Sequence, residues 1–217
     1  MIIIVVALSP MMGYGQLGGN IKYLIGQSEI LEQVNISQDG LQLSVEYGFR
    51  LKEKRLEFHP GMGYRFAFKG SGDEGRISAF DMDLNTAIYP FDFGGDCDCP
   101  TFSKEGNLIK KGLFVEISPG MSFQKLKREV VPFQNPDEPT SYSVSNSLFK
   151  YTFAMGLDIG ISESFTLTPM VSYSGFSSVE WLGLNRDGSK GTLDDQSFLG
   201  LGFRMVYKPD PKRLRRR

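Results

Sequence analysis

Large apolar residues alternate with polar or small ones through most of this chain, and this period of two constrains its fold more than any other feature. Between Phe149 and Ile159 every odd position carries a large apolar residue, whereas the even positions carry Lys, Thr, Ala, Gly or Asp. Successive side chains of a β-strand point to opposite faces of a sheet. The segment therefore predicts a strand with one apolar face and one polar or small face.

The same alternation marks eight segments, each long enough for a tilted strand to cross a bilayer. They cover residues 17–26, 41–51, 56–68, 77–90, 113–124, 149–159, 165–176 and 198–207. Pro60, Pro119 and Pro169 lie inside three of these segments, where each removes a backbone donor. Glycines beside Pro60 and Pro119 predict a β-bulge or a sharp bend at both places.

The connections between these segments alternate in length. Residues 52–55 and 162–164 read KEKR and SES and predict tight polar turns, whereas residues 27–39, 125–146 and 177–195 predict long polar loops. Short turns at one end and long loops at the other are typical of outer-membrane barrels. The sequence therefore predicts an all-β fold, an eight-stranded antiparallel up-and-down transmembrane β-barrel.

The apolar face of this barrel is expected to meet lipid, because an eight-stranded lumen is too narrow to hold the large apolar side chains of every strand. The opposite face carries glycines and a nearly balanced set of charges. The predicted lumen charges are Lys22, Glu46, Arg50, Glu57, Arg65, Asp81, Asp83, Glu116, Lys150, Asp158 and Arg204. Buried charges are tolerated only when they are paired or hydrogen-bonded. We therefore expect an ion-pair network that fills the lumen and leaves no open pore.

Both ends of the chain differ from the barrel segments. Residues 1–15 contain a short apolar run followed by small residues and predict an export signal cleaved before Gln16, with a buried first strand as the alternative. Residues 16–208 are expected to form the barrel, and residues 209–217 a basic periplasmic tail. This tail either holds anionic lipid headgroups or an acidic partner surface, or is simply solvated. The whole chain has 24 basic and 25 acidic residues, which argues against nucleic-acid binding.

The pattern as a whole resembles the small eight-stranded outer-membrane barrels of the OmpA and OmpX type. The last segment, GLGFRMVY, is similar to the carboxy-terminal signal that the barrel assembly machinery reads, with Gly202, Met205 and Tyr207 at matching positions. The resemblance implies a bacterial outer-membrane location with periplasmic termini. It also implies contact with outer-membrane lipids and, during biogenesis, with the barrel assembly machinery.

An enzymatic role would depend on the single histidine, His59. Some barrels of this size resemble hydrolases or acyltransferases of lipid A, which need a His, a Ser and a carboxylate within hydrogen-bond reach. Alternation places His59 on the lumen face beside Glu57, away from a lipid substrate. We therefore expect a structural histidine, no enzyme activity and no cofactor.

The stretch DCDC, with Asp96, Cys97, Asp98 and Cys99, lies in the one oversized connection at the short-turn end. A zinc site lacks a distant Cys or His, a calcium-like site is short of ligands, and a redox site usually has the CxxC spacing. We favour a disulfide brace or a contact with a periplasmic or outer-membrane protein partner, and no metal.

These features favour an envelope structural or interaction protein that acts through its loops and turns. The alternatives are a subunit of an outer-membrane assembly or secretion complex docked through residues 93–111, a lipid A-modifying enzyme, and a small-solute pore.

Overall fold

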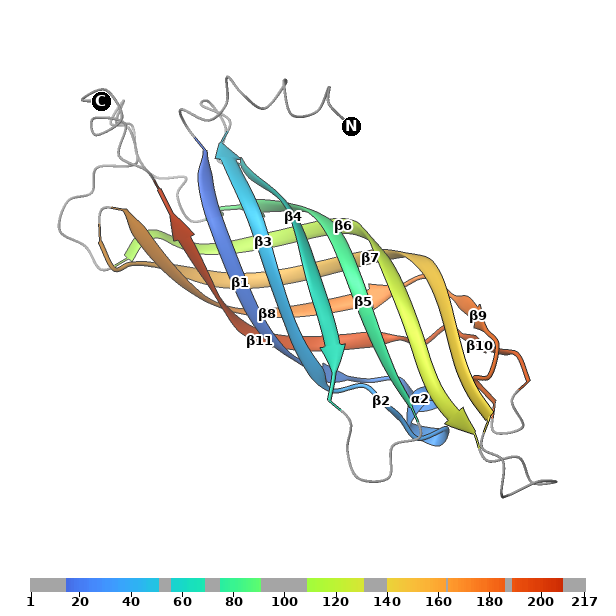
Figure 1. The fold of residues 1–217 in the computed structure, drawn as a ribbon. Helices are drawn as coiled ribbons and strands as arrows, with labels where there is room; N and C mark the ends of the chain where they lie inside the picture. The colour runs from blue at the N-terminus through green and yellow to red at the C-terminus, as the bar shows by residue number, and fades with distance from the viewer. Residues whose placement is uncertain are drawn as a thin grey trace, which may run out of the picture.

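Eight long strands form one closed antiparallel sheet in the computed structural model, which describes residues 15–50, 56–68, 75–90, 109–130, 140–162, 164–185 and 189–208 (Figure 1). The strands are β1 (Gln16–Gly26), β3 (Gly40–Arg50), β4 (Leu56–Ala67), β5 (Gly75–Ile88), β6 (Ile109–Val130), β7 (Thr140–Gly160), β8 (Phe165–Phe176) and β11 (Ser197–Tyr207). Each pairs with the next in the chain, and β11 pairs with β1 to close the barrel. The predicted fold class is confirmed.

The short elements gather at one end of the barrel. They are helix α2 (Glu29–Gln33), β2 (Ile36–Ser37), β9 (Val179–Trp181) and β10 (Gly191–Leu193). Figure 1 shows them at the lower right, far from the start of β1 and the end of β11. We call their end the loop end and the opposite one the turn end. No helix in the described part of the chain is long and apolar enough to cross a membrane.

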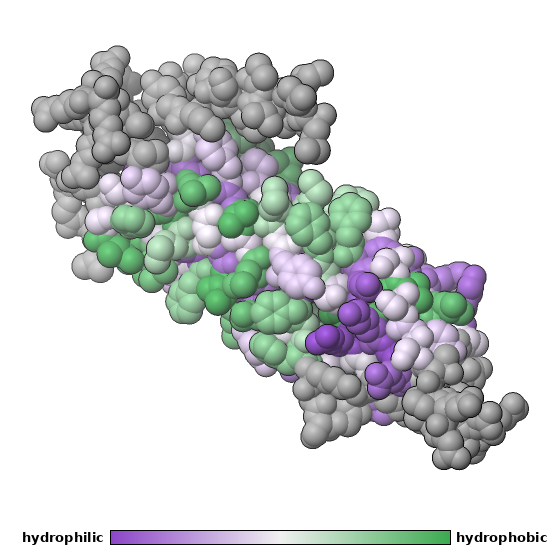
Figure 2. Space-filling model, in the orientation of Figure 1, coloured by the Kyte–Doolittle hydropathy of each residue, from purple (hydrophilic) through white to green (hydrophobic). Residues whose placement is uncertain are grey.

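The outer surface of the barrel carries a belt of large apolar side chains (Figure 2). Outward positions of β6 are apolar or proline from Leu113 to Phe123. At about 3.3 Å per residue and a tilt of roughly 45°, this stretch rises about 23 Å, close to the apolar band of about 25 Å on membrane barrels. More than half-exposed members of the belt include Leu17, Val45, Met62, Leu201, Phe203 and Met205.

Strands β6 and β7 project beyond the belt, so the predicted loop over residues 125–146 is wrong. Their pairing continues to Val130 opposite Thr140, which leaves residues 131–139 as the connection. Outward positions in this extension are polar, with Lys125 opposite Ser145 and Lys127 opposite Ser143. The apolar pattern therefore stops at Phe123, although the backbone ladder does not.

No residue is inserted at the prolines, so the first of the two alternatives for Pro60 and Pro119, a β-bulge, is wrong. The same register holds on both sides of Pro60, Pro119 and Pro169, but the pairing with one neighbouring strand lapses for two residues at each. A proline without an N–H is accommodated by a local gap in one ladder. The register of β6 with β7 shifts instead between Ile109 and Gly112, where Gly112 has φ of 85°.

Candidate functional site

The lumen of the barrel contains most of the charges that alternation predicted for it. Nine side chains are buried and that of Asp83 is partly buried, whereas the side chain of Arg50 lies outside the described residues. The buried nine are Lys22, Glu46, Glu57, Arg65, Asp81, Glu116, Lys150, Asp158 and Arg204. Ion pairs centred on Arg204 and on Lys150 join several of these charges in layers along the barrel axis.

The middle layer is centred on Arg204 of β11. Its Nε lies 2.6 Å from Oε1 of Glu46 on β3, and its Nη2 donates to Oε2 of Glu116 on β6 at 2.5 Å. Asn85 on β5 donates to the second oxygen of Glu46 at 3.1 Å. The guanidinium also lies over the ring of Phe114, 5.6 Å from its centre. One cation thus connects strands from opposite sides of the barrel.

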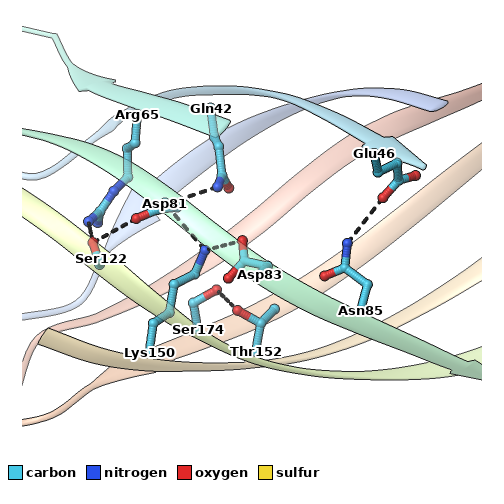
Figure 3. Close-up of polar contacts among 10 residues, drawn as sticks. All are labelled: Gln42, Glu46, Arg65, Asp81, Asp83, Asn85, Ser122, Lys150, Thr152 and Ser174. Carbon is cyan, nitrogen blue, oxygen red and sulfur yellow. Dashed lines mark hydrogen bonds and ion pairs between the residues drawn. The ribbon is translucent and has the colours of Figure 1, made fainter. Parts of the chain in front are cut away.

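A second layer, nearer the loop end, is centred on Lys150 of β7 (Figure 3). Its ammonium lies 3.2 Å from Asp81 and 2.9 Å from Asp83, both on β5. Asp81 also accepts hydrogen bonds from Gln42 at 3.0 Å and from Ser122 at 2.6 Å. Side chains from three other strands therefore hold this carboxylate pair in place.

Two aromatic rings cover this layer on the loop side. The guanidinium of Arg65 lies 4.8 Å from the ring centre of Phe176 and 4.4 Å from that of Phe198. The rings meet edge to face at 5.7 Å and pack with Leu24 and Leu148. The polar lumen therefore ends in an apolar layer.

At the turn end, Tyr89 lies between two carboxylates. Its hydroxyl is 2.9 Å from Asp158 and 3.3 Å from Glu57, and Thr168 donates to the other oxygen of Asp158 at 2.5 Å. His59 is 5% exposed, and its Nε2 lies 3.7 Å from Glu57. The cavity beside these groups holds only about 10 Å³. His59 thus faces a packed lumen and not the lipid belt.

The loops at the loop end share a second hydrophobic core, which we call the loop core. It consists of Leu31, Val34, Ile36, Ile77, Leu126, Trp181, Leu184 and Leu193. Arg128 of β6, 2% exposed, reaches across it and donates to the carbonyls of Gly183, Leu184 and Asn185. The loop core joins α2, β2 and the β9–β10 hairpin to the projecting ends of β5 and β6.

Sequence reasoning missed the neutral members of these layers and most of the loop core. Gln42, Ser122 and Asn85 occupy the same inward face as the charges, which is the signal that could have found them. Leu126 also lies on the inward face of β6, but beyond the belt, where the inward side chains form the apolar loop core.

The cysteine stretch lies outside the described residues, with Asp96, Cys97, Asp98 and Cys99. Within the described ranges, no group of three or more His, Cys, Asp or Glu residues is arranged to hold a metal ion.

Comparisons with known proteins bear on the fold. The sequence matches no protein-family model and has no significant match among curated proteins. The crystal structure of neisserial surface protein A has a TM-score of 0.54 at 9% identity, over 90% of this chain and 97% of that one. This chain has the fold of the small eight-stranded outer-membrane barrels.

Two further solved structures are similar over comparable lengths. A major outer-membrane protein of Thermus thermophilus has a TM-score of 0.49 at 10% identity, over 89% of this chain and 98% of that one. The attachment invasion locus protein Ail of Yersinia pestis has a TM-score of 0.47 at 8% identity, over 89% and 96%.

Proposed function

We propose that this chain is an integral outer-membrane protein whose barrel does not conduct, and which acts as a structural or interaction protein through its loops. The observation that carries the proposal is the filling of the lumen. Ion pairs occupy its middle, the aromatic rings of Phe176 and Phe198 cover them, and the loop core lies beyond. A barrel filled in this way offers its outer surfaces for function and not a channel.

The loop core supports an interaction role for the loop end. Loops usually vary in conformation, but here α2 and the β9–β10 hairpin pack in one core with the buried Trp181, and Arg128 holds the hairpin by hydrogen bonds. Ser28 caps α2 and donates to Asp195 of the loop before β11 at 2.6 Å. Loops held in one arrangement present a defined surface, which lowers the entropy lost when a partner binds.

The arrangement of the ends supports a periplasmic location for the turn end. The first barrel strand begins there and the last one ends there, and the turn between β7 and β8 is short, whereas the folded loops are at the opposite end. Short periplasmic turns and longer external loops are general in bacterial barrels. His59 receives no catalytic role in this proposal, since it lies inside the lumen beside Glu57.

Conductance across a planar lipid bilayer tests the proposal. Refolded protein should give no steady single-channel current, because paired charges and apolar layers block the path of ions. The matched variant is Asp83→Asn, which removes one lumen carboxylate without opening the aromatic layer. A steady wild-type current whose cation selectivity falls in Asp83→Asn would pass through the lumen and contradict the proposal. A current unchanged by the variant would be leakage around the barrel.

A further inference from the structure

The projecting half of the β5–β6–β7 sheet carries a basic patch just beyond the apolar belt. On its outward face Arg76 of β5 lies directly opposite Lys127 of β6, and Lys125 lies two residues closer to the belt, opposite Ser78. All three cations are exposed. The next outward pair toward the belt is Phe80 and Phe123, whose ring centres are 6.4 Å apart. Figure 2 shows strongly hydrophilic side chains at the loop ends of β5 and β6, next to the green belt.

Two like charges directly opposite each other on neighbouring strands destabilise a sheet unless an anion lies near both. Within the ranges that the structure describes, no carboxylate pairs with Arg76, Lys125 or Lys127, and no side-chain hydrogen bond engages them. The nearest exposed carboxylate on the same face of β6 is Glu129, which lies opposite Ser141 and farther from the belt. Among the described residues the two facing cations therefore have no anionic partner, and an anion bound between them would relieve their repulsion.

A groove of about 330 Å³ opens at this patch. Arg76 and Lys127 line it together with Ser141 and Ser143 of β7, and the carboxylate of Glu129 is a further lining group. Two cations and two hydroxyl donors are the groups that bind phosphate oxygens. The groove lies on the outside of the barrel, separate from the lumen layers.

We propose that this groove binds the phosphate of a lipid headgroup in the leaflet at the loop end. The position of the groove next to the belt favours a lipid over a dissolved anion. A lipid whose phosphate is held by Arg76 and Lys127 would have its acyl chains beside Phe80 and Phe123, along the belt. Basic residues at the surface of a membrane attract anionic headgroups by the same electrostatics. The inference rests on the proposed membrane location of the barrel and adds to it a specific lipid class.

Native mass spectrometry of the full-length protein, refolded in a nonionic detergent, tests the assignment. The probes are short-chain phosphatidic acid, phosphatidylcholine with the same acyl chains, and inorganic phosphate. The wild type should retain phosphatidic acid in preference to phosphatidylcholine. Each cation removed, in Arg76→Gln, Lys127→Gln and their double variant, should lower that preference by about fivefold.

The control is Lys190→Gln, which removes an exposed cation at the same end of the barrel but outside the patch. It should leave the preference unchanged, and the charge-conserving exchange of Arg76→Lys with Lys127→Arg should retain it. An unchanged preference in the double variant would overturn the proposal, as would equal binding of the two lipids by the wild type. Displacement of the lipid by inorganic phosphate at the same concentration would overturn the assignment to a lipid headgroup.

The fold of every variant is checked by the shift in gel mobility between unheated and boiled samples, and insertion is checked with phosphatidylcholine vesicles. A protein that inserts but has no lipid preference contradicts this inference alone. A protein that folds but does not insert into vesicles contradicts the proposed membrane location first.

Discussion

Arg204 is the residue on which the lumen depends most heavily. It lies within ion-pair distance of two buried carboxylates, Glu46 at 2.6 Å and Glu116 at 2.5 Å, while carboxylates outnumber cations among the predicted lumen charges whose side chains the structure describes. Removing one partner of a buried ion pair leaves an uncompensated charge, and that penalty exceeds the net value of the pair itself.

We expect Arg204→Met to lower the free energy of unfolding by about 3–5 kcal/mol, because Glu46 and Glu116 would both lose their cation. Urea unfolding in detergent micelles, followed by gel mobility, measures the change. Adding Glu46→Gln and Glu116→Gln to the same chain removes the unpaired charges and should recover most of the loss. If the triple variant were no more stable than Arg204→Met, the loss would come from packing against Phe114 and not from charge.

Gly202 is required by close approach of two strands at the seam that closes the barrel. It lies opposite Lys22 in the β1–β11 pair. A Cβ placed on it would clash with the carbonyl oxygen of Ile21 and would lie 2.8 Å from Cα of Lys22, both backbone atoms that cannot rotate away. Gly19, in the same pair of strands, has nothing within 4 Å of such a Cβ.

Gly202→Ala should therefore destabilise the barrel by about 1–3 kcal/mol, whereas Gly19→Ala should change its stability little. The fraction of folded barrel against urea concentration compares the two variants under the same conditions. Equal midpoints for Gly202→Ala and Gly19→Ala would mean that the seam can widen to admit a methyl group.

At the scale of elements, one side chain of β6 holds the β9–β10 hairpin in place. Arg128 donates to three consecutive carbonyls, at Gly183, Leu184 and Asn185. Each buried carbonyl left without a donor costs about 1–3 kcal/mol. The pairing that closes the barrel does not depend on these contacts, so the hairpin can loosen while the barrel stays folded.

We expect Arg128→Met to expose the hairpin to trypsin at Lys190, an exposed residue next to β10. The control, Lys125→Met, removes one trypsin site from the same strand, but Lys125 points outward and makes no hydrogen bond to a described loop carbonyl. Fragments are measured by mass spectrometry on protein whose gel mobility remains that of a folded barrel. Emission of the single Trp181, fully buried in the loop core, should shift to the red in Arg128→Met only. Equal cleavage of both variants would contradict the anchoring role of Arg128.

At the scale of the whole molecule, the fold was predictable because alternation is a local property of each strand. The belt at Phe149, Phe153 and Met155 follows directly from the odd positions of one segment. The partners of Arg204 were not predictable, since they depend on the register of β11 with strands more than 80 residues away in the sequence. A pattern within one strand contains no information on that register.

The projecting ends of β6 and β7 escaped prediction for a different reason. Within the belt the outward residues are apolar and the inward residues polar, but beyond it Lys125 and Lys127 point outward while Leu126 points into the loop core. The side chains keep their alternation beyond the belt, but there the outward side chains are polar and the inward ones are apolar. A search for apolar residues at the outward positions ends at Phe123. A search for alternation of polar and apolar residues, whichever face is apolar, would have continued into the projecting ends.

The change from Phe123 to Lys125 on β6 also defines how deeply the protein sits in its bilayer. A displacement by one pair of residues corresponds to about 5 Å along the membrane normal for a strand tilted by roughly 45°. Inward movement would carry lysines toward hydrocarbon, where a lysine at the midplane costs about 2–4 kcal/mol, and outward movement would expose phenylalanine to water. Because movement in either direction costs free energy, the barrel has a single preferred immersion depth. A thinner or thicker bilayer would have to adapt to that depth.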